Sequence, residues 1–487
     1  MVLPELHVLR LSGNPFRILP GDIFLPLRQS PLLNLFLDKC QLSHVDEGTF
    51  SPLKLLQKLS LRGNPDLCME NLARATANIG SLSNASLDLS LNELQEIPTD
   101  VLASLNSTLM QLFLRGCNVG EIRNGSFPLL PVLDVLDLSL CRIRAIGAGT
   151  FDALPHLRTL DLSQNKLTGV PKAIMLSTLV SLVLNENPYY GYFEMLQEHG
   201  DDDRGYDDGF FVPPFENMDN LLALSLSGTA IRMQKITKYM FAGLKALMRL
   251  DLNDCNLYSI ETGAFSALES LEILDMSGNQ LEIENDGEFL GLTELKALFL
   301  HDNHISSQGA TSPFKTLRNL TVLKLNRNSM THLTEDFFAE METMETLILS
   351  ENDIEQWNSP VLGATKNMHN LRLDRNKLVA VTEAMLTDFA NLATLDLSGN
   401  PFKCDCGLYH FYRWASENQE KLEGWLEEGA YTCWANNSTQ YSFLLDGDEI
   451  FRDCVRSGDT NDQAPTATKA GLIIALSVLV VHVSIVG

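Results

Sequence analysis

LPHLRTLDLSQNKLTGVP, residues 154–171, is the clearest copy of a pattern, LxxLxLxxN, that recurs along most of this 487-residue chain. In this copy the pattern is supplied by Leu157, Leu160, Leu162 and Asn165. A repeat of this kind indicates a stack of similar units that each pack on their neighbours, and not a single globular core. It therefore predicts the architecture before any other residue is considered.

Sixteen copies can be aligned on the asparagine position. Eight of the fifteen intervals between them are 24 residues, and the others lie between 22 and 28 residues except for one of 42. This regularity predicts about sixteen stacked repeats over residues 1–400. The aligned positions are Asn14, Cys40, Asn64, Asn92, Cys117, Cys141, Asn165, Asn187, Thr229, Cys255, Asn279, Asn303, Asn328, Asn352, Asn376 and Asn400.

Each unit has a direct physical interpretation. The xxLxL segment alternates like a β-strand, so its leucines fill the interior and the residues between them face outward. The asparagine turns inward, where its amide bonds backbone groups of neighbouring loops, and a cysteine or threonine there keeps a smaller donor. Stacked at ~4.8 Å, sixteen parallel strands span an arc of ~75 Å. The pattern thus predicts an α/β solenoid with a concave parallel sheet, closed on its far side by Phe50, Phe127, Phe151, Phe265 and Phe289.

The 24-residue unit with a phenylalanine in its second half resembles the leucine-rich repeats of animal extracellular proteins, which include Toll-like receptor ectodomains. The resemblance covers about residues 1–454 and implies a horseshoe with a parallel β-sheet on its concave side. It is specific for the fold and says little about the ligand.

A cysteine-rich segment follows the last repeat. NPFKCDCGLYHFYRW, residues 400–414, is followed by two further cysteines. This order resembles the C-terminal cap of secreted leucine-rich repeat proteins, which covers the last unit of a solenoid, and it assigns the cap to residues 401–454. The resemblance implies disulfides Cys404–Cys433 and Cys406–Cys454, although spacing alone allows three connectivities. A zinc site is the alternative, but CxC lacks the two-residue gap usual in such sites.

Disulfides would place the chain in an oxidising compartment. Five cysteines lie outside the cap, and we expect Cys40, Cys68, Cys117, Cys141 and Cys255 to be buried, unpaired thiols. A Cys117–Cys141 bridge is the alternative, because stacked units bring equivalent positions close together. Extracellular exposure is also indicated by glycosylation sequons at Asn84, Asn106, Asn124, Asn319, Asn436 and Asn437.

The charge balance limits the partners. The chain has 36 basic and 62 acidic residues, a net charge of -26, which disfavours non-specific binding to nucleic acid or an anionic membrane. It does not exclude a local basic patch. The composition therefore does not indicate a nucleic-acid partner.

The C-terminal end carries a membrane signal. A polar spacer, residues 455–469, precedes eighteen residues, 470–487, without Asp, Glu, Lys or Arg. The segment matches either a glycosylphosphatidylinositol signal or a transmembrane helix, and the lack of basic residues after it favours the lipid anchor. Residues 1–25 hold neither a leader-like apolar run nor a cysteine-rich cap. We therefore expect a part of a longer surface protein.

Two surface regions are candidates for ligand binding. In the later units the residues between the strand leucines form a mixed charged stripe, and a polar protein or anionic ligand docking there would use Lys324, Arg327, Arg372 and Arg375. The alternative is an ordinary solvated face. Aspartates of the LDL type, such as Asp137, Asp161 and Asp396, belong to the repeat pattern and are not predicted to be catalytic.

The second region is the interval of 42 residues, which we interpret as an insertion over residues 188–220. It contains five aspartates between positions 201 and 208. A ligand-contact loop carrying Phe210 and Phe211, or sulfation of Tyr206, competes with a flexible acidic excursion. A calcium site is weaker, since the hand-type spacing and its closing glutamate are missing.

The sequence contains no GxSxG, GxxxxGK or HExxH motif, so we predict no enzyme, cofactor or metal. The expected function is recognition at the cell surface, in the plasma membrane with an extracellular solenoid. The resemblance implies a Toll-like innate immune receptor ectodomain that binds a protein or microbial ligand and dimerises. The alternative is a glycosylphosphatidylinositol-anchored adhesion protein or co-receptor without its own signalling domain.

Overall fold

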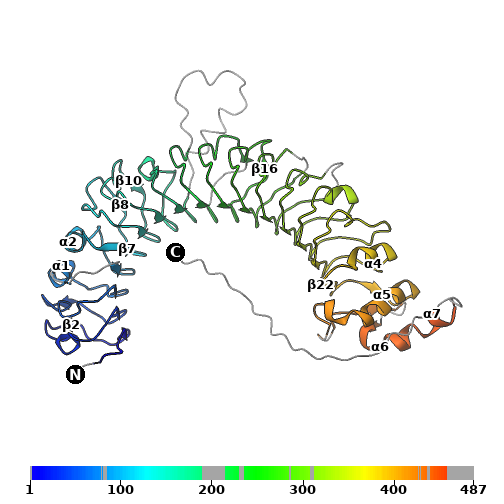
Figure 1. Cartoon of the computed structure of the whole chain (residues 1–487), viewed down its shortest axis with the longest axis horizontal. Helices are drawn as coiled ribbons and strands as arrows, with labels where there is room; N and C mark the ends of the chain where they lie inside the picture. The colour runs from blue at the N-terminus through cyan, green and yellow to red at the C-terminus, as the bar shows by residue number, and fades with distance from the viewer. Residues whose placement is uncertain are drawn as a thin grey trace, which may run out of the picture.

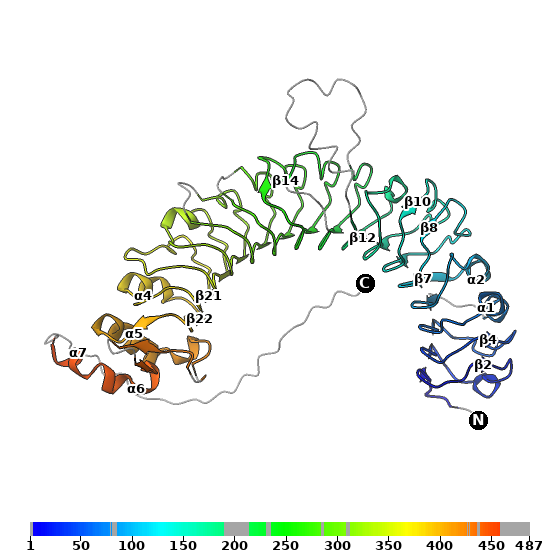
Figure 2. The ribbon, with the colours of Figure 1, turned by 180° about the vertical axis from the view of Figure 1, so that it is seen from behind.

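The computed structural model describes residues 3–77, 79, 85–188, 214–229, 235–283, 287–307, 312–425, 427, 429–435 and 439–457. These residues form an open arc of stacked repeats (Figure 1). Strands line the inner, concave edge of the arc, and short strands, turns and helices form its outer edge (Figure 2). The predicted leucine-rich repeat horseshoe is therefore confirmed.

One parallel sheet runs through all of the predicted repeats. Its sixteen strands lie in the order in which they occur along the chain, so each repeat pairs with the repeats before and after it. Each strand precedes the ladder residue of its own unit, which confirms the alignment of sixteen units. The strands are β1 (Val8–Arg10), β3 (Asn34–Phe36), β5 (Lys58–Ser60), β6 (Ala85–Asp88), β7 (Leu109–Phe113), β9 (Val135–Asp137), β11 (Thr159–Asp161), β12 (Ser181–Val183), β13 (Ala223–Ser225), β15 (Arg249–Asp251), β17 (Ile273–Asp275), β18 (Ala297–Phe299), β19 (Val322–Lys324), β20 (Thr346–Ile348), β21 (Asn370–Arg372) and β22 (Thr394–Asp396).

The strand leucines form the inner wall of a continuous core. In β11, Leu160 is buried, whereas Thr159 and Asp161 on either side of it are half-buried and face the concave side. Equivalent leucines stack directly, because Leu160 is in register with Leu136 and with Leu182. Burial of a leucine stabilises the fold by roughly 2 kcal/mol relative to exposure, so this column accounts for the strict leucine pattern.

The asparagine ladder ties each loop to the loop before it. In Asn352 the side-chain Nδ2 donates to the carbonyls of Leu325 and Leu349, at 2.9 and 3.0 Å. Its Oδ1 accepts from the backbone N–H of Met330 at 3.1 Å. One side chain thereby satisfies three backbone groups that no strand pairing reaches. The predicted role of the inward asparagine is confirmed.

Cysteine occupies the ladder position in four units, where its thiol can donate a hydrogen bond but lacks the amide oxygen that accepts one. The Cys117 and Cys141 thiols donate to the carbonyls of Leu89 and Leu114, at sulfur–oxygen distances of 3.2 and 2.9 Å. Both thiols are free, so no disulfide joins them. Burial raises the pKa of the Cys117 thiol to about 12 and that of Cys141 to about 11. The prediction of buried thiols was wrong for Cys68, which is exposed at the start of α1.

A stack of phenylalanines closes the outer side. The rings of Phe241, Phe265 and Phe289 lie on one another with centroids 6.1 and 6.5 Å apart, within the range of stabilising aromatic pairs. Phe215 extends this stack, since its ring lies 6.5 Å from that of Phe241. Residues 214–220, which we had assigned to the insertion 188–220, thus already belong to a regular repeat.

The outer edge of the arc is built from short elements. Among the described residues, three pairs of two-residue parallel strands join neighbouring units, and short helices lie along the same edge (Figure 1). The strand pairs are β2 (Ile18–Leu19) with β4 (His44–Val45), β8 (Glu121–Ile122) with β10 (Ala145–Ile146), and β14 (Lys235–Ile236) with β16 (Ser259–Ile260). The helices are η1 (Leu25–Leu27), α1 (Met69–Thr76), α2 (Thr99–Ser104), η2 (Lys172–Ile174), η3 (Glu335–Phe338) and α4 (Glu383–Phe389).

A disulfide-bonded cap covers the last strand. Both predicted disulfides, Cys404–Cys433 and Cys406–Cys454, are present. The cap meets the edge of β22 through its backbone, because Glu423 N–H donates to the Leu395 carbonyl at 2.9 Å. The hydroxyl of Tyr431 accepts from Leu397 N–H at 3.3 Å. The cap elements are β23 (Phe402–Lys403), α5 (Cys406–Glu417), η4 (Gln419–Lys421), β24 (Cys433–Trp434), β25 (Gln440–Tyr441), α6 (Phe443–Ile450) and α7 (Arg452–Ser457).

In the portion of the chain that the structure describes, no helix has the length and apolar character needed to span a membrane. The predicted membrane segment, residues 470–487, lies outside the described residues, and so does the spacer 455–469 except for residues 455–457 at the end of α7.

Replacing a ladder asparagine is expected to destabilise the solenoid strongly. Asn352→Ala leaves Met330 N–H without its acceptor and removes a donor from two carbonyls. We expect a loss of about 3 kcal/mol in the free energy of unfolding, measured by denaturant titration. The control is Asn367→Ala, since this exposed side chain makes one bond, to the Glu342 carbonyl, and should cost less than about 1 kcal/mol. Equal losses in the two variants would contradict the ladder role.

The free thiols are expected to differ in reactivity. At pH 8 only Cys68 of the five free cysteines should react with iodoacetamide in the native protein, and all five should react after unfolding in denaturant. Peptide mass spectrometry reads out the labelled sites, and native labelling of Cys117 or Cys141 at pH 8 would refute the assignment.

The buried thiol of Cys117 also makes stability depend on pH. Because burial raises the pKa of Cys117 above the ordinary 9.0, the contribution of this thiol to the free energy of unfolding is present below pH 9 and is lost as the pH rises toward 12.

Candidate functional site

The concave sheet places equivalent residues of neighbouring repeats side by side. Lys324 is in register with Ile348, Ile348 with Arg372, and Arg372 with Asp396. These side chains alternate with the buried leucines and therefore face the open side of the sheet. Two of the predicted ligand-binding residues, Lys324 and Arg372, thus lie on the sheet at equivalent positions two strands apart.

The other two predicted residues lie on the rim of the sheet. Arg327 and Arg375 each precede a ladder asparagine, and their φ angles are 54° and 53°. This left-handed conformation turns the chain from the strand into the ladder loop, and glycine takes the same place at Gly278 and Gly399. The predicted stripe is therefore two separate rows of side chains.

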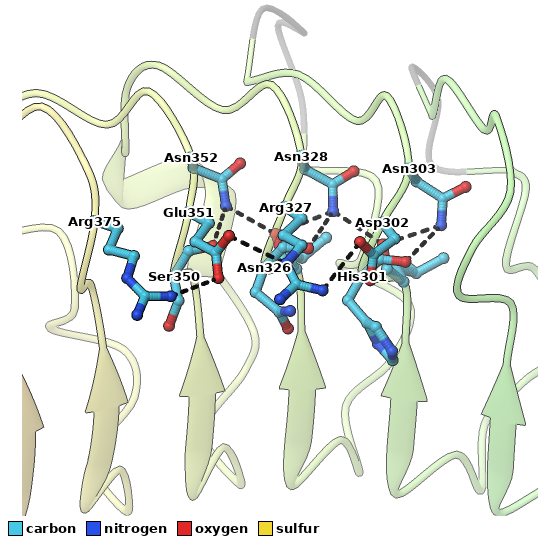
Figure 3. Close-up of polar contacts among 12 residues, drawn as sticks. His301, Asp302, Asn303, Asn326, Arg327, Asn328, Ser350, Glu351, Asn352 and Arg375 are labelled. Carbon is cyan, nitrogen blue, oxygen red and sulfur yellow. Dashed lines mark hydrogen bonds and ion pairs between the residues drawn. The ribbon is translucent and has the colours of Figure 1, made fainter.

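The rim residues of four consecutive repeats form an ion-pair ladder (Figure 3). Arg327 lies between two acidic residues, with its Nε 3.1 Å from a Glu351 carboxylate oxygen and one terminal nitrogen 3.5 Å from Asp302. The second Glu351 oxygen lies 3.1 Å from a terminal nitrogen of Arg375. The charges alternate along the rim in the order Asp302, Arg327, Glu351 and Arg375, and we call these four residues the rim ladder.

The rim ladder perturbs the groups within it. The hydrogen bond and the charge of Arg327, with a further contribution from Arg375, lower the pKa of the Glu351 carboxyl. The same bond raises the pKa of the Arg327 guanidinium. Glu351 therefore stays ionised below the pH at which an ordinary glutamate is protonated, and the ladder keeps its alternating charge under mildly acidic conditions. Because these groups are exposed, their ion pairs contribute little to the free energy of unfolding. They do, however, fix an alternating pattern of charge on the surface.

The two sheet cations also have partners. Arg372 forms an ion pair with Glu423 of the cap, which joins the cap to the concave surface. The Lys324 ammonium lies 4.8 Å from the centre of the Phe299 ring in the preceding strand, a cation–π contact. The predicted stripe is indeed mixed in charge: Arg327, Arg372 and Arg375 are each paired with a glutamate, whereas Lys324 contacts an aromatic ring.

The aspartates of the LDL pattern have a structural role. One oxygen of Asp137 accepts from Ser139 N–H at 2.8 Å, and Asp161 accepts from Ser163 N–H at the same distance. Asp396 bonds the residue two positions on in the same way. Each carboxylate holds the turn that leaves its strand, which supports their assignment to the repeat pattern.

A shallow cleft of about 500 Å³ lies beside the strands in the middle of the arc. Met110, Pro131 and Val132 supply apolar surface, and Asp134 and Arg158 supply opposite charges. Its size is that of a small-molecule pocket, but it is wide open. The repeat pattern did not predict this cleft, because most of its residues come from the loops before the strands and share no motif.

Several predicted sites cannot be compared with the structure. Tyr206, Phe210 and Phe211 lie outside the described residues, and so do the sequon residues Asn84, Asn436 and Asn437. The other three sequon residues, Asn106, Asn124 and Asn319, are exposed. Within the described parts of the chain no group of three or more His, Cys, Asp or Glu side chains is arranged to hold a metal ion.

Known proteins share the repeat. A family model described as leucine rich repeat matches residues 107–167, 131–188, 245–305 and 310–354. Bovine (Bos taurus) fibromodulin is 34% identical over 145 residues, which are 29% of this chain and 35% of fibromodulin. Mouse (Mus musculus) CD180 antigen is 25% identical over 235 residues, 43% of this chain and 35% of that antigen. The chain thus matches about a third of the length of each of these relatives.

Solved structures share the solenoid. The TLR13–ssRNA13 complex superposes with a TM-score of 0.59 at 21% identity, covering 92% of this chain and 76% of the other. Mouse RP105 in its complex with MD-1 has a TM-score of 0.64 at 20% identity, with 88% and 73% covered. At this identity the likeness shows the fold. The chain therefore contains leucine-rich repeats, and its solenoid has the same fold as those of TLR13 and RP105.

Proposed function

We propose that this chain is the extracellular recognition part of a Toll-like innate immune receptor, which binds a protein or microbial ligand on its solenoid surface. The observation that carries the proposal is the open face of the sheet. Parallel sheets are usually covered on both sides, whereas here sixteen strands are packed on one side and present half-buried and exposed side chains on the other. A large, rigid, uncovered face is suited to binding another molecule.

The comparisons support the same role. TLR13 is described in complex with a single-stranded RNA and RP105 in complex with MD-1, so solenoids of this shape bind ligands of different chemistry. The disulfides of the cap support an oxidising, extracellular location. The rim ladder adds a fixed charge pattern that a polar ligand can recognise by electrostatic complementarity. Arg327 and Arg375 remain our candidates for ligand contact on the rim, and Lys324 and Arg372 on the sheet.

The second candidate is a glycosylphosphatidylinositol-anchored adhesion protein or co-receptor. It would use the same open face and differ in the segment 470–487, whose eighteen residues lack Asp, Glu, Lys and Arg. The two candidates therefore make the same prediction for the solenoid and different predictions for its attachment to the membrane.

Reversing the four charges of the rim ladder is expected to weaken ligand binding without unfolding the solenoid. The variant Asp302→Arg, Arg327→Glu, Glu351→Arg and Arg375→Glu keeps the alternation of charge and thus the fold. A ligand selected on the wild-type protein should bind it at least about tenfold more weakly, as measured by surface plasmon resonance. The control inverts two ion pairs on the outer edge, Glu70 with Arg74 and Glu121 with Arg123, and should bind normally. Unchanged binding to the inverted ladder would remove the rim from the recognition site.

Attachment is tested on cells that express the chain behind a cleavable secretory leader, with an epitope tag placed between the leader and residue 1. We expect the tag to be detected on intact cells. Release by phosphatidylinositol-specific phospholipase C would establish the anchored candidate, and retention in the membrane fraction would favour the receptor. A tag that is accessible only after permeabilisation would contradict both.

A further inference from the structure

The first three repeats bring four cations together on the concave side of the arc. Two of these cations lie within strands and two lie in the turns that follow strands: Arg10 in β1, Lys58 in β5, Lys39 after β3 and Arg62 after β5. All four are exposed or half-buried. Among the described residues none of them forms an ion pair with a carboxylate. We call these four residues the basic cluster. In contrast, the arginines of the rim ladder are neutralised by neighbouring acids.

Two aspartates share this part of the sheet, and local hydrogen bonds hold both of them. Asp38 accepts from the hydroxyls of Ser12 and Ser60 and from the backbone N–H of Arg62. Asp88 accepts from Ser90 N–H at 2.9 Å. The local balance is thus four cations to two carboxylates, whereas the whole chain has 36 basic and 62 acidic residues. The first three repeats thus have a local excess of positive charge, although the net charge of the whole chain is negative.

A phenylalanine holds two of the cations in place. The Arg10 guanidinium carbon lies 4.2 Å from the centre of the Phe36 ring, and the Lys58 ammonium lies 5.8 Å from it. Arg10 and Phe36 are register partners, and Lys58 follows on the next strand. Such contacts fix a cation without cancelling its charge, because the ring brings no negative ion. The cluster is therefore ordered before a ligand arrives.

We propose that the first three repeats bind a sulfated polysaccharide through the basic cluster. The proposal rests on the recognition role above and names a partner class for it. Guanidinium groups bind tetrahedral oxyanions through paired N–H bonds, and ammonium groups bind them as point charges. The cations occupy three adjacent repeats spaced at ~4.8 Å, so a chain with several anionic groups along its length can contact them together.

The surroundings favour this class over two other polyanions. A single-stranded nucleic acid gains affinity from base stacking on aromatic rings, but Phe36 is already engaged by Arg10 and Lys58. An acidic peptide cannot pair with β3 or β5, because each of these strands already pairs with a neighbour on both sides, and the loop after β3 also bonds the next repeat, where Lys39 N–H donates to the Arg62 carbonyl at 2.8 Å. An extended peptide also turns alternate side chains away from the surface. A sulfated glycan needs neither an aromatic platform nor backbone pairing.

The test measures binding of a heparin oligosaccharide to the whole chain at physiological salt, where charges beyond about 8 Å are largely screened. The variant Arg10→Gln, Lys58→Gln and Arg62→Gln removes three charges and keeps the side-chain stems. We expect its affinity to fall at least about tenfold. The matched control, Lys296→Gln, Arg318→Gln and Lys377→Gln, removes three cations that are paired with acids outside the rim ladder and should stay within about twofold of wild type. Thermal melting checks that both variants are folded.

An equal loss in both variants would show that only net charge matters and would overturn the proposal. So would binding of single-stranded polyadenylate or polyglutamate as tight as that of heparin and with the same dependence on the cluster. If heparin does not bind while a ligand still requires the rim ladder, the glycan assignment falls and the recognition role stands. If heparin binds through the cluster but the chain never reaches the cell surface, the glycan site stands and the receptor role falls.

Discussion

The structure depends on hydrogen bonds that each ladder asparagine makes to the repeat before it. From Asn64 onward each such side chain bonds backbone groups in two units, and Asn376 reaches 27 residues back to the Leu349 carbonyl. Unpaired backbone groups in a buried loop would cost several kcal/mol per repeat, so these bonds decide whether an irregular loop can be packed inside a solenoid. The leucine column and the phenylalanine stack then supply the apolar burial. A cysteine at this position keeps the donor and gives up the amide oxygen.

The repeat pattern predicted most of the fold, because leucine burial and asparagine bonding recur at fixed spacing. It did not predict that Arg327 and Arg375 leave the sheet, since the left-handed turn before the ladder residue is a backbone feature that many residue types adopt. A signal was present: the residues before Asn303, Asn328, Asn352 and Asn376 are alternately acidic and basic. The basic cluster was missed for another reason. Its definition requires knowing which carboxylates lie near each cation, and these distances exist only in the folded chain.

The concave face therefore has two electrostatic regimes on one scaffold. In the later repeats cations and acids compensate each other along the rim, so this edge is polar but nearly neutral. In the first repeats an aromatic ring contacts cations that keep their charge, so this part of the surface carries a local excess of positive charge. Both arise from the same geometry, in which side chains 24 to 26 residues apart in sequence become neighbours. A single solenoid can thus present unlike surfaces without adding a domain.

The contacts between successive rim residues constrain how the sequence of this edge can evolve. Arg327 touches the rim residues of the repeats on both sides of it, and Glu351 does the same one step further on. A substitution at one rung therefore alters the surroundings of two others, and replacement of Arg327 by an acid would set three like charges in a row. Amino-acid substitutions at rim positions one repeat apart should therefore be correlated, whereas substitutions in the outer loops should be more independent of one another.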